Sequence, residues 1–255
     1  MTSLRADPLD DKVALITGAA RRIGAVIAET LHEAGMTIAV HYRGSAADAV
    51  ALVARLNGIR HASAQAFQAD LSVDGAPAEL LDTVLDWSGR LDVLVNNAST
   101  FYPTPLGEIH ESAWSDLIGS NLKAPLFLSQ AAAPHLAAAR GSIVNIVDIH
   151  ARRPLRDHHV YGAAKAGLAM LTRSLAKDLA PEVRVNGVSP GAIAWPEADM
   201  SEAVKETILD EIPLGRTGEP ADIANAVLFL VRDATYTTGN IIAIDGGRSI
   251  GWQAQ

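Results

Sequence analysis

Residues 143–165, IVNIVDIHARRPLRDHHVYGAAK, place an apolar run, a polar loop and the start of a helical segment in one short stretch. The run 143–147 is mostly apolar and β-branched, which is typical of a buried strand. Apolar character stops at Asp148, and beyond the loop the helical segment carries Tyr161 and Lys165. Side chains that can do chemistry therefore begin where a strand stops.

Tyr161 and Lys165 are four residues apart, so at about 100° per residue they share one face of the predicted helix. A phenol beside an ammonium can act in proton transfer, because the cation favours the phenolate and pulls a pKa of about 10 toward neutrality. The same spacing also fits a tyrosine and a lysine on an ordinary surface helix. The pair alone does not decide the function, which must be judged from the rest of the sequence.

Composition narrows the class of protein. The chain has 255 residues, 49% of them hydrophobic, and can bury a sizeable core. Its net charge of −8 argues against a nucleic-acid partner. It contains no cysteine, which excludes disulfides and thiolate metal sites, and we expect no metal. No uncharged run approaches the ~20 residues of a membrane span, and residues 1–11 lack a signal core and are expected to be a flexible N-terminus. We expect a cytoplasmic protein with no membrane partner.

Strand-like and helix-like segments alternate along the chain. Predicted strands cover residues 13–17, 37–42, 64–69, 91–95, 142–147, 184–188 and 241–244. Predicted helices cover 23–33, 46–56, 79–87, 161–179, 221–231 and a long stretch, 114–139, interrupted by Pro125 and Pro134. Continuous apolar strands followed by helices predict a parallel sheet covered on both faces. Without a linker or repeat, residues 1–255 are expected to form one α/β, doubly wound domain.

Ligands of such sheets bind beyond the carboxyl ends of the strands. After the first strand, residues 17–24 read TGAARRIG and lead into a helix. In a glycine-rich turn of this kind, backbone N–H groups and the helix N-terminus can meet a phosphate. Arg22 stands where the usual fingerprint has a central glycine, and a plain tight turn is the alternative.

The turn after the second strand distinguishes between two dinucleotides. An NAD site needs an acid there for the ribose 2′-hydroxyl, but none occurs before Asp48. The sequence supplies His41, Arg43 and Ser45 instead, and cations and donors suit a 2′-phosphate. We therefore expect NADP rather than NAD, with a solvated turn as the alternative.

Two later strand ends have both a functional and a structural interpretation. Asp70, followed by Leu71, can bond an adenine amino group or cap a helix. Asn96 and Asn97 are expected to tie strands together. Phe101 can stack on a flat ligand or be an ordinary core residue.

The glycine turn, Asn96-Asn97-Ala98, Asn121, the Tyr161–Lys165 pair and Pro190-Gly191 together resemble the short-chain dehydrogenase/reductase superfamily, over residues 12–249. The resemblance implies a Rossmann-type sheet of seven parallel strands with helices on both faces and a nicotinamide cofactor. It implies that Tyr161 is the acid and that Lys165 holds the nicotinamide ribose and lowers the pKa of Tyr161. It also implies that Asn121 positions a water in a proton relay.

One departure narrows the resemblance. The superfamily usually has a serine thirteen residues before the tyrosine, where this chain has Asp148. The pteridine reductases have this change and share Arg22, the turn 41–45 and the stretch 96–106, NNASTFYPTPL. Residues 190–196 are similar to the bacterial branch of that group. The chain therefore resembles the bacterial-type, NADPH-dependent pteridine reductases, which implies a small-molecule pterin or folate substrate and a homotetramer.

The resemblance also implies the membership of the site. The catalytic residues would be Asp148, Tyr161, Lys165 and Asn121. The substrate would contact Arg22, Ser99, Phe101, Asp148, Tyr161 and Trp195. NADPH would contact Gly18, Arg21, Arg22, Ile23, Gly24, His41, Tyr42, Arg43, Ser45, Asp70, Leu71, Asn97, Ala98, Ser99, Tyr161, Lys165, Pro190, Gly191 and Ile193.

The chemistry of Asp148 separates the competing functions. A carbonyl reductase needs a neutral hydroxyl donor, whereas a carboxylate can accept from the ring nitrogens and exocyclic amino group of a pterin. The alternatives are an NADPH-dependent carbonyl or quinone reductase, which Asp148 disfavours, and a non-catalytic NADP-binding sensor, which intact Tyr161, Lys165 and Asn121 disfavour. The cations of the loop 152–156 either meet an anionic substrate tail or are solvated.

Overall fold

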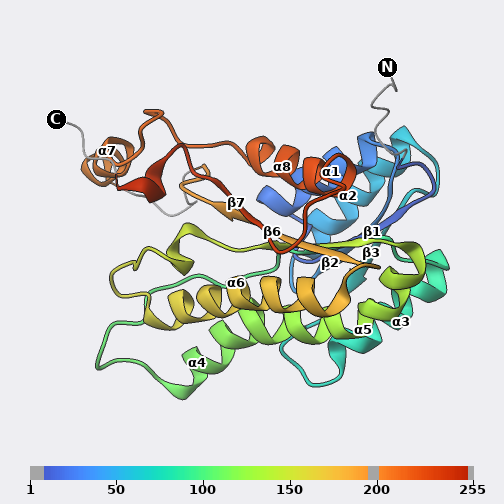
Figure 1. Cartoon of the computed structure of the whole chain (residues 1–255), viewed down its shortest axis with the longest axis horizontal. Helices are drawn as coiled ribbons and strands as arrows, with labels where there is room; N and C mark the ends of the chain where they lie inside the picture. Colours follow the sequence, from blue (N-terminus) through green and yellow to red (C-terminus); the bar gives the residue numbers. More distant parts are fainter. Residues whose placement is uncertain (1–8, 195–200, 252–255) are drawn as a thin grey trace.

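The computed structural model describes residues 9–194 and 201–251 and confirms the predicted fold class. Seven parallel strands form one sheet in the order β3-β2-β1-β4-β5-β6-β7 (Figure 1). Most of the predicted flexible N-terminus lies outside the described residues, and Leu9, near its end, is buried. The strands are β1 (Val13–Ile16), β2 (Thr37–Tyr42), β3 (Ala64–Gln68), β4 (Val93–Asn96), β5 (Ser142–Ile146), β6 (Arg184–Pro190) and β7 (Ile241–Ile244).

Helices cover both faces of the sheet. Figure 1 shows α1, α2 and α8 on one side and α3, α5 and α6 on the other, with α4 below α6 and α7 at the end of the molecule near the chain terminus. The helices are α1 (Arg22–Glu33), α2 (Ala46–Ile59), α3 (Ala76–Ser88), α4 (Glu111–Ile118), α5 (Ala124–Ala139), α6 (His159–Leu179), α7 (Glu202–Asp210) and α8 (Pro220–Arg232).

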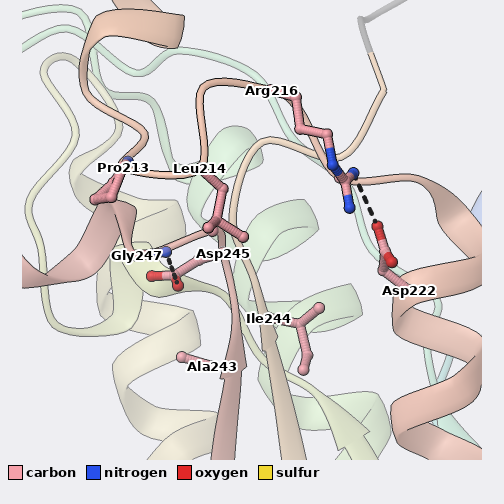
Figure 2. A pocket seen from close by; sticks show the side chains of 10 residues that line it. Pro213, Leu214, Arg216, Asp222, Ala243, Ile244, Asp245 and Gly247 are labelled. Atoms are coloured by element: carbon pink, nitrogen blue, oxygen red, sulfur yellow. Dashed lines mark hydrogen bonds and ion pairs between the residues drawn. The ribbon is translucent and has the colours of Figure 1, made fainter.

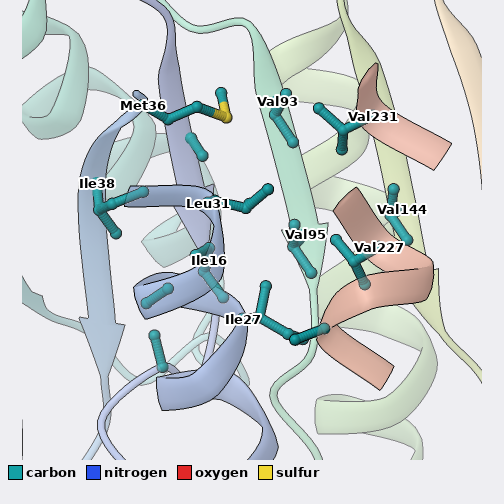
Figure 3. Close-up of a cluster of buried hydrophobic side chains, with 14 of the residues drawn as sticks. Ile16, Ile27, Leu31, Met36, Ile38, Val93, Val95, Val144, Val227 and Val231 are labelled. Atoms are coloured by element: carbon teal, nitrogen blue, oxygen red, sulfur yellow. The ribbon is translucent and has the colours of Figure 1, made fainter. Parts of the chain in front are cut away.

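Burial on both faces explains why inner strands such as β1 and β4 are continuously apolar. Along β1, Ala14 and Ile16 belong to the core cluster shared with α1 and α8, whereas Leu15 belongs to the cluster on the opposite face. Alternate side chains therefore enter different cores, and no position faces water. Figure 3 shows the first cluster, which includes Ile16, Ile27, Leu31, Met36, Ile38, Val93, Val95, Val144, Val227 and Val231.

The long predicted helix is interrupted at a different place from the one expected. A π-helical turn, Gly119–Lys123, separates α4 from α5, and Asn121 lies inside it. Pro125 lies in the first turn of α5, directly after the π-helical turn, and Pro134 lies within α5 without ending it. The predicted interruption at the prolines was therefore wrong.

A row of buried polar side chains joins the middle strands to the helices below them. Asn96 on β4 donates to Oδ1 of Asn145 on β5 at 2.8 Å, and Asn145 donates to the hydroxyl of Thr172 on α6 at 2.9 Å. All three side chains are buried, so each depends on the next for its hydrogen bond. The expected structural role of the strand-end asparagines is thus seen at Asn96.

The first turn of α1 packs unusually close to the loop before it. Gly24 has no side chain, and a Cβ at this position would lie 2.4 Å from the carbonyl oxygen of Gly18 and 2.6 Å from Nδ2 of Asn97. Gly18 itself has a φ of +61° and a hypothetical Cβ 2.9 Å from the Cα of Ala98. The two glycines therefore bring helix, loop and β4 into contact.

We expect Gly24→Ala to lower the free energy of unfolding by about 1–3 kcal/mol, because the methyl group meets backbone that cannot move away cheaply. Gly58→Ala on α2 is the matched control, since nothing lies within 4 Å of its Cβ position. That change should be neutral or raise stability by up to about 1 kcal/mol. Urea unfolding of both variants measures the difference, and equal midpoints would contradict the close packing at Gly24.

Candidate active site

A pocket of about 1320 Å³ opens at the carboxyl ends of the strands. It lies where the strand order reverses between β1 and β4, the usual ligand site of an open parallel sheet. All but two of the residues assigned from the sequence to catalysis, cofactor or substrate line this pocket. Asn121 is not among the lining residues, and Trp195 lies outside the described residues.

Tyr161 and Asp148 form a direct hydrogen bond at the floor of the pocket. The tyrosine hydroxyl donates to Oδ2 of Asp148 at 2.7 Å. The other carboxylate oxygen accepts the backbone N–H of His150 at 2.8 Å and so caps a short 3-10 turn, Ile149–Ala151. Asp148 therefore has the structural role of a cap and also contacts Tyr161, with one oxygen for each.

Lys165 is buried one helical turn beyond Tyr161. Its Nζ donates to the carbonyl of Ile146 at 3.0 Å, at the end of β5, and lies 5.7 Å from the centre of the Tyr161 ring. Burial lowers the pKa of Lys165 to about 8, although the charge of Asp148 opposes this shift. The ammonium is thus held at the pocket floor at a high cost in hydration.

The electrostatics of Tyr161 differ from the expectation. Burial raises the pKa of Tyr161 far above its usual value, and the neighbouring Asp148 carboxylate raises it further. The pKa of Tyr161 therefore moves in the direction opposite to the predicted lowering, because burial and the adjacent Asp148 carboxylate both disfavour the phenolate. The predicted role of Lys165 beside the phenol stays a prediction. Tyr161 is a neutral hydroxyl and hence a hydrogen-bond donor.

Asn121 is completely buried beneath the pocket. Its Nδ2 donates to the carbonyls of Leu117 at 2.9 Å and Thr100 at 3.0 Å. Its Oδ1 has no hydrogen-bond partner, one of two such buried side-chain atoms in the described part of the chain. The side chain braces the π-helical turn, and the predicted water relay stays a prediction.

The glycine loop is anchored by β4. Oγ1 of Thr17 accepts the N–H groups of Asn97 and Ala98, both at 2.9 Å. In return, Nδ2 of Asn97 donates to the carbonyls of Thr17 at 2.9 Å and Gly18 at 3.1 Å. The loop that begins α1 is therefore held on one side by four hydrogen bonds to the end of β4.

His41 fixes the other side of the same loop. Its Nδ1 accepts the N–H of Gly18 at 3.1 Å, and its Nε2 lies 3.1 Å from the carbonyl of Ala69, to which it donates. The ring is 2% exposed, and burial lowers the pKa of His41 to about 4. The ring is therefore neutral with both nitrogens engaged, so it positions the loop and brings no charge to a phosphate. His41 lines the pocket, and its predicted cofactor contact stays a prediction.

Three arginines supply the positive charge at this end of the pocket. Arg21 lies 3.7 Å from Asp48, and Arg43 lies 3.6 Å from Asp116, with both arginines more than half exposed. Such exposed pairs are weak and leave the guanidinium groups free to bind a ligand. Arg22 begins α1 with a φ of +53°. These cations, the crowded glycine loop and the helix N-terminus fit a dinucleotide with a 2′-phosphate.

Asp70 closes a turn and does not cap a helix, because α3 begins only at Ala76 with Gly75 as its N-cap. Its Oδ1 accepts the N–H of Ser72 at 3.0 Å and the Ser72 hydroxyl at 2.6 Å. These bonds lower the pKa of Asp70 and close the turn after β3. The side chain also lines the pocket, and the expected adenine contact stays a prediction.

Aromatic rings lie at the opposite end of the pocket. Phe101 meets the Tyr161 ring edge to face, with centroids 4.8 Å apart and planes at 79°. Its other contact is a stacked arrangement on His158 at 4.6 Å. Phe101 is 55% exposed and is a pocket residue, so its alternative as an ordinary core residue was wrong.

The arginines of the loop 152–156 do not line the pocket, although Leu155 of the same loop does. Arg152 and Arg156 are exposed, and Arg153 donates to the carbonyl of Arg248. The cation that does line the pocket near this loop is Arg248, whose guanidinium pairs with Glu211 at 2.9 Å. Arg248 and His158 were not assigned to the site from the sequence. Neither directly follows a predicted strand or belongs to a motif with a defined spacing.

A second pocket of about 410 Å³ lies between β7 and the start of α8 (Figure 2). Its charged groups are already satisfied. Arg216 faces Asp222 at 3.5 Å, and the two oxygens of Asp245 accept the N–H groups of Gly247 and Ser249. We therefore assign the chemistry to the larger pocket.

Two negative findings concern the described ranges, 9–194 and 201–251. These ranges contain no group of three or more histidine, cysteine, aspartate or glutamate side chains placed to hold a metal ion. No helix within them is long and apolar enough to cross a membrane.

Comparisons with known proteins point to reductases. A family model described as enoyl-(acyl carrier protein) reductase matches residues 18–249. Pteridine reductase 1 of Leishmania tarentolae is 42% identical over 93% of this chain and 96% of its own length. Two 3-oxoacyl-(acyl-carrier-protein) reductases, from Staphylococcus aureus and Staphylococcus epidermidis, are 38% and 37% identical over 92% and 93% of this chain and 97% and 98% of their own lengths.

The low pKa of Lys165 makes stability depend on pH. Between about pH 8 and 10.5 the unfolded lysine binds a proton that the folded one has released, so its contribution to the free energy of unfolding rises with pH. We expect the stability of wild type relative to Lys165→Met to increase across this window. Lys177→Met, at an exposed position of the same helix, is the control and should show no trend. Urea unfolding at several pH values tests this, and a flat difference for Lys165→Met would contradict it.

Proposed function

The chain belongs to the short-chain dehydrogenase/reductase family and uses NADPH, and we propose that it reduces a pteridine ring. The observation that carries the proposal is the hydrogen bond between Tyr161 and Asp148. A carboxylate at this position accepts hydrogen bonds, whereas reduction of a carbonyl oxygen is best served by a second neutral donor beside the tyrosine. The relatives include both substrate classes, and Asp148 favours the pteridine.

The shape of the pocket supports a flat substrate. Phe101 presents a ring beside Tyr161, within the space lined by Asp148 and Lys165. A planar heterocycle can stack on such a ring and keep its polar edge toward a carboxylate and a hydroxyl. An acyl chain gains nothing specific from this arrangement.

Each residue then has a defined part. NADPH, when bound, supplies the hydride. Tyr161 is neutral and donates a proton from its hydroxyl, and Asp148 accepts hydrogen bonds from the amino and ring N–H groups of the substrate. Lys165 places a buried positive charge that stabilises negative charge developing on the phenol oxygen as the proton leaves.

At the cofactor end of the pocket, some residues hold the glycine loop in shape and others supply positive charge. His41 and Thr17 hold the glycine loop in place, so that its N–H groups and the first turn of α1 can meet the pyrophosphate. Arg43, Ser45 and the neighbouring arginines surround the place of the 2′-phosphate. This division supports a preference for NADPH over NADH.

We also propose a homotetramer. Helices α4, α5 and α6 carry exposed large apolar side chains, Trp114, Phe127 and Met170, at 51%, 44% and 63% exposure. Side chains of this size are costly to leave in water, and a second copy would cover them. Light scattering after size exclusion tests the assembly.

We expect Arg43→Ala to raise the KM for NADPH roughly tenfold to a hundredfold, because one charge-assisted phosphate contact is worth about 1.5–3 kcal/mol. The KM for NADH should change little. Arg55→Ala is the matched control, since Arg55 is also exposed and paired but lies outside the pocket. Equal effects of Arg43→Ala on both cofactors would show that this arginine does not read the phosphate.

The decisive test of the proposed function is Asp148→Ser. We expect it to lose most reduction of dihydrobiopterin, because a donor on the bound ring is left unpaired, at a cost of about 1–3 kcal/mol. Serine can keep the cap on His150, and it restores a neutral donor that favours a diketone.

The measurement is the ratio of kcat/KM for dihydrobiopterin and a diketone in both proteins. Asp178→Ser, at an exposed position of α6, controls for the change in charge. A ratio that stays within about threefold of wild type, less than 1 kcal/mol, would remove the support of the pteridine assignment.

A further inference from the structure

His158 is a pocket residue whose ring lies against Phe101. The two ring centroids are 4.6 Å apart with 20° between the planes, a stacked arrangement. Both side chains line the large pocket. A phenyl ring has two faces, and His158 covers one of them. A flat ligand can therefore stack on Phe101 only from the other side.

The backbone of His158 joins two segments that are far apart in the sequence. It forms an isolated parallel bridge with Thr104, whose N–H donates to the carbonyl of Asp157 at 2.5 Å. On its other side, His158 is the N-cap residue of α6, and its carbonyl accepts the N–H of Gly162 at 2.9 Å. His158 is thus the link between the loop of Phe101 and the first turn of the helix that carries Tyr161.

A hydrogen bond fixes the plane of the His158 ring. Its Nδ1 lies 2.7 Å from the carbonyl oxygen of Arg156, and since a carbonyl can only accept, Nδ1 carries the proton and donates. The ring is consequently held from behind by the loop and cannot turn freely. Phe101, which is 55% exposed, gains a fixed surface to rest on.

We infer that His158 is a positioning residue for substrate recognition, which holds Phe101 so that a flat heterocycle stacks beside the Tyr161 hydroxyl. The inference rests on the proposed pteridine reductase function. A diketone offers no ring for this stacking, so its binding does not depend on His158. The class of ligand that His158 selects is a planar, nitrogen-containing ring.

The kinetic test compares His158→Ala, which removes the ring, with His158→Phe, which keeps one. With dihydrobiopterin, His158→Ala should raise the KM about threefold to tenfold, the size of one aromatic pair, and His158→Phe should remain within about twofold. The kcat and the KM values for NADPH and a diketone should change less than twofold. The exposed neighbour His159→Ala is the matched control. Equal KM increases for dihydrobiopterin and the diketone, or no rescue by His158→Phe, would overturn the inference.

A second measurement needs no substrate. The chain has four phenylalanines, so protein labelled with 4-fluorophenylalanine gives few fluorine resonances, and Phe101→Leu assigns one of them. His158→Ala should shift the Phe101 resonance and leave the others in place. An unmoved resonance would overturn the inference whatever the enzyme reduces. A shifted resonance in a protein that does not turn over dihydrobiopterin would support the positioning of Phe101 and overturn the proposed function.

Discussion

The junction between the ends of β1 and β4 is the constraint on which the pocket depends. Thr17 and Asn97 exchange hydrogen bonds across it, each using side chain and backbone. Because Thr17 is buried, opening the junction would leave several polar groups without partners, and that is costly. The glycine loop, the start of α1 and the neighbouring His41 ring are all positioned from this point. The candidate catalytic groups, Asp148 after β5 and Tyr161 and Lys165 on α6, then lie across the same strand ends.

The sequence predicted the sheet well because burial on two faces leaves a strong pattern. Strands β1, β2, β4, β5 and β7 are short, mostly apolar runs, and parallel topology places the polar residues that follow at one edge. Helix α7 was missed for the converse reason. None of its residues is buried, so only the weak apolar pattern of Val204, Ile208 and Leu209 marks it in the sequence. The interruption predicted at Pro134 was wrong because tertiary packing keeps α5 helical through a residue that usually ends a helix.

The electrostatics of the site were harder to predict than its membership. A residue type tells which charge is available, but burial decides whether it is used. His41 stands in a turn that would suit a cation, yet its ring is buried and neutral. Tyr161 has a lysine on its helix face, yet burial and then the adjacent Asp148 carboxylate raise its pKa. His158 and Phe101 meet by stacking across the fold, and no spacing in the sequence records such a contact.

The hydrogen bond between Tyr161 and Asp148 must be replaced by hydrogen bonds to any ligand that binds between them. In the protein alone, the hydroxyl and Oδ2 satisfy one another. A ligand that only accepts takes the hydroxyl and leaves the carboxylate oxygen without its donor. A ligand that accepts at one atom and donates from a neighbouring one replaces both halves of the bond, and no hydrogen bond is lost. The pocket therefore favours binding of a ligand whose edge places an acceptor beside a donor. This selection acts on binding and precedes any difference in the rate of reduction.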